Sequence, residues 1–108
     1  MFPLLCVEPR EGQLLLFMVV EHFKPGCLRD IYNQAREQGR SLPEGLVYVD
    51  SWIEAGFGRC FQLMECDDAS LLQEWVLEWD QFGTFEIVPV VQSKVTAALV
   101  ERASRGQP

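Results

Sequence analysis

Apolar and polar positions alternate along the chain in patterns that predict strands and helices. Residues 14–23, "LLLFMVVEHF", are almost continuously apolar, which is typical of a central strand covered on both faces. A stripe at helical spacing then predicts a first helix: Leu28, Ile31, Tyr32 and Ala35. Gly39 is suited to end that helix with a left-handed residue.

The middle of the chain has the pattern of a β-hairpin. The second strand is predicted in "LVYVDSWIEA", residues 46–55, and the third in "RCFQLMEC", residues 59–66. The string "AGFG" between them has the glycines of a tight turn.

A second helix, a fourth strand and a final helix follow the hairpin. "DDAS" supplies an aspartate that can cap the second helix, and Gly83 is suited to close it. The apolar stripe of this helix is Leu72, Trp75, Val76 and Trp79. "FEIVPVV", residues 85–91, predicts the fourth strand, and Ser93 is suited to cap a last helix in "KVTAALVERASR". Val95, Ala98 and Leu99 lie on one side of that helix.

The order β-α-β-β-α-β predicts an α+β protein with the ferredoxin-like fold and an antiparallel four-stranded sheet. In that fold the strand order is 4-1-3-2, so the fourth strand lies at an edge. Pro89 fits an edge strand, because proline has no backbone N–H to donate to a neighbouring strand and is poorly tolerated in the centre of a sheet. We expect one domain over residues 14–102, a loosely held N-terminal extension over 1–13 and a C-terminal tail over 103–108.

The hairpin turn sets which side chains share a face of the sheet. A four-residue turn closed by Glu54 and Arg59 predicts the pairs Ile53–Cys60, Trp52–Phe61, Asp50–Leu63 and Tyr48–Glu65. One face then lies under the helices and carries Val47, Val49, Ser51, Ile53, Cys60, Gln62, Met64 and Cys66. The other, called here the mixed face, carries Tyr48, Asp50, Trp52, Glu54, Arg59, Phe61, Leu63 and Glu65. A bulge in the hairpin would change this assignment.

The two remaining strands are assigned by similarity of composition. On the first strand Phe17, Val19, Glu21 and Phe23 are predicted on the mixed face, and Leu16, Met18, Val20 and His22 under the helices. On the fourth strand Glu86, Val88 and Val90 are predicted on the mixed face, with Glu86 near Glu21. An uncovered sheet face rich in aromatic residues must be hidden by a partner, so we expect a homodimer.

Charge and cysteine usage narrow the functional classes. The chain has 9 basic and 16 acidic residues, a formal charge of -7, and no basic stripe, so nucleic acid and anionic membranes are not expected partners. Four cysteines without metal-site spacing, Cys6, Cys27, Cys60 and Cys66, favour reduced thiols in the cytoplasm. The N-terminus has no basic segment before its apolar start, so no signal peptide is expected.

The mixed face offers two interpretations. As a ligand pocket between this sheet and a partner it would combine apolar area with a few polar groups, the composition of small-molecule sites. Its predicted lining is Phe17, Tyr48, Asp50, Trp52, Glu54, Arg59 and Phe61. Alternatively, the aromatic residues are ordinary interface packing and Glu54–Arg59 is an ion pair at the hairpin end.

Catalytic and metal-binding candidates are few. Glu21, His22 and Glu54 are candidates for a general base, and a Cys60/His22 dyad is conceivable. His22 is the only histidine, and the carboxylates follow no metal-binding spacing. We therefore expect no metal site and no bound cofactor.

Several strings also carry a family resemblance. "FMVVEHF", "LPEGLVYVDSWIE", "RCFQLMECDD", "LLQEWVLEWDQF" and "FEIVPVV" resemble the bacterial domain of unknown function DUF3303 and cover residues 16–91 in order. More distantly, the layout is similar to dimeric α+β barrel proteins, which include cofactor-independent monooxygenases, muconolactone isomerases and stress-responsive barrel proteins. The resemblance implies a dimer and implies no particular reaction.

Three functions remain open. The first is a cytoplasmic homodimer that binds a small, partly apolar or aromatic molecule between its sheet and the partner. The second is a cofactor-independent enzyme of proton transfer or oxygenation in the same cavity, with Glu21, His22 or Glu54 as base. The third is a structural assembly module.

Overall fold

Residues 14–106 of the 108-residue chain are described by the structure, which is a computed structural model. The predicted N-terminal extension and Cys6 lie outside the described residues. The elements are β1 (Leu15–Phe23), α1 (Leu28–Gln38), β2 (Val47–Ile53), β3 (Arg59–Cys66), α2 (Ser70–Trp79), the 3₁₀ turn η1 (Asp80–Phe82), β4 (Gly83–Val90) and α3 (Ser93–Ser104). The order agrees with the predicted one, and α3 continues two residues into the segment predicted as a tail.

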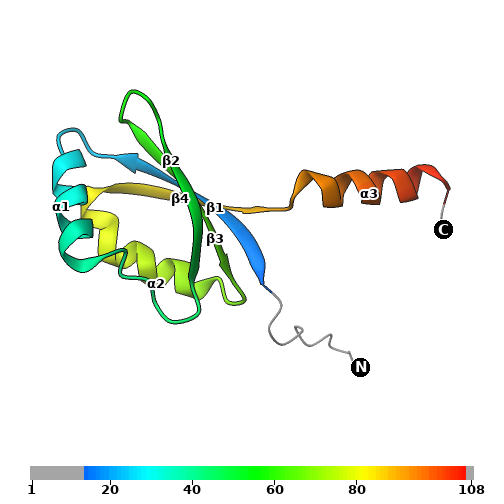
Figure 1. Cartoon of the computed structure of the whole chain (residues 1–108), viewed down its shortest axis with the longest axis horizontal. Helices are drawn as coiled ribbons and strands as arrows, with labels where there is room; N and C mark the ends of the chain where they lie inside the picture. The colour runs from blue at the N-terminus through cyan, green and yellow to red at the C-terminus, as the bar shows by residue number, and fades with distance from the viewer. Residues whose placement is uncertain (1–13, 107–108) are drawn as a thin grey trace.

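The four strands form one antiparallel sheet in the order β2-β3-β1-β4. This is the strand order of the ferredoxin-like fold, so the predicted fold class is confirmed. β4 lies at an edge, as Pro89 indicated. Figure 1 shows α1 and α2 on the same side of the sheet. The other side, called here the open face, is covered by none of the helices in residues 14–106. It carries Asp50, Trp52 and Phe61 and so corresponds to the predicted mixed face.

The hydrophobic core lies between the sheet and α2. Leu72, Trp75 and Trp79 of α2 are buried, as their helical spacing predicted. They pack with Val19 and Met64 of the two central strands, which are fully buried. α1 contributes only Ile31 to the buried set, so this helix covers the sheet less completely.

The hairpin register is confirmed over most of its length. Ile53 pairs with Cys60, Trp52 with Phe61 and Asp50 with Leu63. A bulge between Tyr48 and Asp50 then shifts the register, so that Tyr48 pairs with Met64 and Val47 with Glu65. The prediction for these two positions was wrong: Tyr48 lies on the helix side, and Val47 lies on the open face.

The prediction of which β1 side chains lie away from the helices was also wrong. Phe17 pairs with Met64 and Glu21 with Cys60, and all four of these residues are buried on the helix side. Leu16, Met18, Val20 and His22 therefore lie on the open face, together with Glu86, Val88 and Val90 of β4. Because β1 is apolar on both faces, hydrophobicity could not distinguish them. The assignment followed the charge of Glu21, and that carboxyl is buried.

Candidate functional site

The structure divides the predicted pocket residues between the two sides of the sheet. Asp50, Trp52, Glu54, Arg59 and Phe61 lie on the open face or at its hairpin end, as predicted. Phe17 and Tyr48 lie on the helix side. The seven residues therefore do not share one face of the sheet.

The polar groups at the hairpin end of the open face are paired. Arg59 donates to Glu54 Oε2 at 2.8 Å, and its guanidinium lies over the ring of Phe61. Glu86 Oε1 lies 2.7 Å from His22 Nε2. His22 and Cys60 point to opposite sides of the sheet, so they form no dyad, and Glu86 is not near Glu21.

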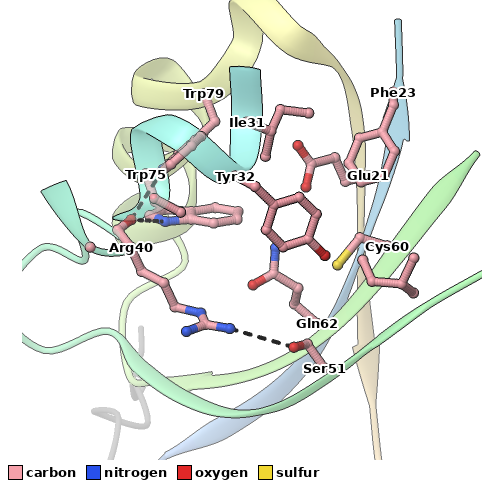
Figure 2. Close-up of a pocket in the computed structure, with 13 residues that line it drawn as sticks. Glu21, Phe23, Ile31, Tyr32, Arg40, Ser51, Cys60, Gln62, Trp75 and Trp79 are labelled. Atoms are coloured by element: carbon pink, nitrogen blue, oxygen red, sulfur yellow. Dashed lines mark hydrogen bonds between the residues drawn. The ribbon is translucent and has the colours of Figure 1, made fainter. Parts of the chain in front are cut away.

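A cavity of about 240 Å³ lies on the helix side, between α1, the end of α2 and the sheet. Its wall is mostly aromatic and apolar, with a few polar side chains. The lining residues are Glu21, Phe23, Ile31, Tyr32, Ala35, Gly39, Arg40, Ser51, Ile53, Cys60, Gln62, Trp75 and Trp79. Figure 2 shows Tyr32 at the centre of this group, between Glu21 and Gln62. A small cavity of this composition suits a ligand below drug size.

Glu21 is the most unusual group in the cavity. Glu21 is only 4% exposed, and it lies on β1, a central strand of the sheet, rather than in a loop. Burial disfavours the charged carboxylate and raises the pKa of Glu21 from 4.5 to about 7. The Glu21 carboxyl, which faces the cavity, therefore changes its protonation state near neutral pH.

Arg40, an exposed residue of the cavity wall, connects the end of α1 to α2. Its backbone carbonyl accepts hydrogen bonds from Nε1 of Trp75 at 2.8 Å and Nε1 of Trp79 at 3.1 Å. Its guanidinium lies over the ring of Tyr48, 3.5 Å from the centroid, and reaches Ser51 Oγ at 3.5 Å. Figure 2 shows the hydrogen bonds of Arg40 as dashed lines. Both indole N–H groups are thus occupied, and the two tryptophans offer only ring surface to a ligand.

Two more groups in the cavity have shifted pKa values. Burial, and then the negative charge of Glu21, raise the pKa of the Cys60 thiol to about 11. Burial likewise raises the pKa of the Tyr32 phenol, with the charges of Cys60 and Glu21 adding to the effect. Both groups stay protonated at neutral pH, so Cys60 is not an activated nucleophile.

Sequence reasoning found Glu21 as a candidate but missed its surroundings. Tyr32, Trp75 and Trp79 were placed on the apolar stripes of their helices, and Trp75 and Trp79 are indeed buried, whereas Tyr32 is 47% exposed. Arg40 lay in a predicted loop without a motif. The one sequence feature that could have indicated this cavity was Tyr32, whose phenol lies in an otherwise apolar helical stripe.

Glu21 alone among the three predicted bases faces this cavity. Glu54 is held by Arg59, whose hydrogen bond keeps the pKa of that carboxyl below its usual range, so it is a poor base. His22 lies on the open face. Residues 14–106 contain no cluster of three or more potential metal ligands. None of the helices in this part of the chain could cross a membrane.

A family model matches most of the chain. The model of the family described as "Domain of unknown function (DUF3303)" matches residues 15–104. No curated protein and no solved structure gives a significant match.

Proposed function

Since the chain belongs to the DUF3303 family, whose description assigns no activity, its function must be argued from the site, and we propose that it binds a small, partly apolar molecule in the cavity between α1 and the sheet. The observation that carries this proposal is the carboxyl of Glu21, buried and facing the cavity with a pKa near 7. Burying a carboxyl without a cation destabilises the fold, so such a group is a candidate for function.

The chemistry of the wall defines the ligand class. Tyr32, Trp75 and Trp79 offer ring surface, which favours a flat apolar portion. Glu21 either donates a hydrogen bond or accepts a proton, which favours a weakly basic nitrogen or a carbonyl oxygen at the inner end. Arg40 places a permanent positive charge at an exposed part of the wall and favours an anionic or strongly polar group there. A small aromatic molecule with these two polar ends fits all three features.

The binding test is a thermal-unfolding screen of the full chain at pH 7. The probes are benzoate, nicotinate, nicotinamide, imidazole-4-acetate and indole-3-acetate at millimolar concentration. A compound present at 100 times its Kd should stabilise the fold by about 2.7 kcal/mol. Ala35→Phe, which fills the cavity from α1, should abolish that gain, and Glu74→Gln on the exposed side of α2 should preserve it. Stabilisation that survives Ala35→Phe would place the binding site elsewhere.

Proton transfer at Glu21 is the second candidate function. A carboxyl with a pKa near 7 is matched to work as a general base at neutral pH, and none of the other predicted bases shares the cavity. A compound that binds in the screen would then be converted, with a rate that rises through pH 7. Glu21→Gln should stop turnover while the same compound still binds. Binding without conversion would leave the binding function alone.

Two further features of this proposal concern assembly and location. The open face is apolar at its centre, and no helix of the described residues covers it. This supports the predicted homodimer, and in that case the face would have a structural role. Cys27, Cys60 and Cys66 are free thiols, which supports a reducing compartment such as the cytoplasm.

A further inference from the structure

The open face has an apolar centre with acidic groups around it. The central row across β4, β1 and β3 is Val88, Met18 and Leu63, and the next row has Val20 beside Phe61. Four carboxylates, Asp50, Glu54, Glu65 and Glu86, border this centre against a single permanent cation, Arg59. The formal charge of the open face is therefore -3 with His22 neutral.

α3 has the complementary character. The helix and its C-cap residue carry Lys94, Arg102 and Arg105 against one acid, Glu101, which gives a formal charge of +2, whereas residues 14–92 carry 13 acidic and 5 basic residues. Val95 and Leu99, four residues apart on one side, are 44% and 46% exposed. No residue of α3 is buried. The helix is thus basic, apolar along one side and without a partner in the described chain.

The connection to β4 keeps α3 away from its own sheet. Only Val91 and Gln92 link the two elements, and Gln92 is extended with φ -61° and ψ 138°. Figure 1 shows α3 projecting beyond the body of the domain. Twelve residues span about 18 Å, more than the roughly 14 Å between the outer strands of a four-stranded sheet. The helix is therefore long enough to cross a whole open face.

We propose that α3 of one copy of this chain packs across the open face of a second copy, reciprocally, to form a homodimer. Val95 and Leu99 lie over the centre formed by Met18, Leu63 and Val88. Arg102 and Lys94 lie near the surrounding carboxylates. The open face and α3 have opposite formal charges and attract each other. Two open faces, both at -3, repel each other. This interface is separate from the ligand cavity, which lies on the opposite side of the sheet.

The first test is the mass of the full chain by light scattering after size exclusion at 10–100 µM. The wild type should have twice the 12.4 kDa chain mass. Leu99→Asp should be monomeric, because it places a charge in the apolar contact. Ala97→Asp, about 160° around the helix from Leu99, is the matched control and should stay dimeric. A monomeric wild type, or a dimeric Leu99→Asp, would overturn the proposal, and the latter would indicate stacking of two sheets.

Complementation tests the reciprocal exchange itself. Met18→Asp damages the open face and should also be monomeric; circular dichroism confirms that it folds, and Val88→Asp at the edge strand replaces it if it does not. An equimolar mixture with Leu99→Asp should recover dimers, since each mixed pair keeps one intact α3 on one intact open face. Sheet stacking predicts no such recovery. A mixture that stays monomeric would rule out the exchange.

Discussion

Glu21 of β1 lies directly opposite Cys60 of β3, and both side chains face the helices. Each is disfavoured in its charged form, first by burial and, for Cys60, also by the charge of its neighbour. The two groups therefore form a protonated pair in the wall of the cavity at slightly acidic pH. Above pH 7 only Glu21 ionises.

This pairing predicts a slow reaction of Cys60 with alkylating reagents. Its pKa near 11 leaves very little thiolate at pH 7.5, whereas Cys27 is half-buried in a loop before α1. Peptide-level mass spectrometry after timed exposure to iodoacetamide should show Cys27 modified well before Cys60. Glu21→Gln should speed the reaction of Cys60 by removing a negative charge. Equal rates at Cys27 and Cys60 in the folded protein would contradict the structure.

Most of the fold could be predicted from the sequence because its signals are local. Helical spacing located Trp75 and Trp79 in the core, the glycines of "AGFG" located the hairpin, and Pro89 located the edge strand. Each of these depends on backbone chemistry or on the periodicity of one element. The strand order then follows from the succession of the elements.

The candidate site could not be predicted in the same way, because it depends on which face of β1 the helices cover. Val19 and Val20 have the same hydrophobicity but lie on opposite faces, and only the pairing with β3 decides between them. The charge of Glu21 pointed to the wrong face, because a charged residue is ordinarily left exposed. The bulge before Asp50 likewise moved Tyr48 to the helix side without any local signal.

Gly83 at the start of β4 is predicted to tolerate no side chain. A Cβ there would overlap the backbone carbonyl oxygen of His22 on the neighbouring strand. Gly83→Ala should therefore lower the free energy of unfolding by about 1–3 kcal/mol or more, the usual range for overpacking. Gly56→Ala in the hairpin turn is the control, since nothing lies within 4 Å of the position that its methyl group would take. Urea denaturation measures both, and equal midpoints would contradict the close approach of β1 and β4.

The shared acceptor at Arg40 predicts non-additive effects of the two tryptophans. Trp75→Phe or Trp79→Phe removes one indole donor and leaves the other on the carbonyl of Arg40. Each should lower the free energy of unfolding by about 0.5–1.5 kcal/mol for the lost hydrogen bond, besides the effect of the lost ring volume. The double variant leaves that carbonyl without either donor and should cost more than the sum. Trp52→Phe, half exposed on the open face, is the control. Additive costs in urea denaturation would show that water replaces the second donor.

The pKa of Glu21 predicts the direction in which stability changes with pH. In the unfolded chain this carboxyl ionises near its ordinary value of 4.5, and in the folded chain near 7. The folded state therefore binds more protons between these values, so the contribution of Glu21 to stability is fully present below pH 4.5 and is lost as pH rises through 7.

Each pKa unit corresponds to about 1.4 kcal/mol, so the loss is roughly 3 kcal/mol at a residue this buried. Glu21→Gln keeps the shape of the protonated carboxyl and cannot ionise. The difference in unfolding free energy between wild type and Glu21→Gln should therefore favour the variant progressively from pH 5 to pH 8, whatever the other groups contribute. Glu74→Gln, at an exposed position, should show no such trend. A difference that stays constant over this range would show that Glu21 ionises freely in the folded protein, and that carboxyl would then give no reason to expect a ligand in the cavity.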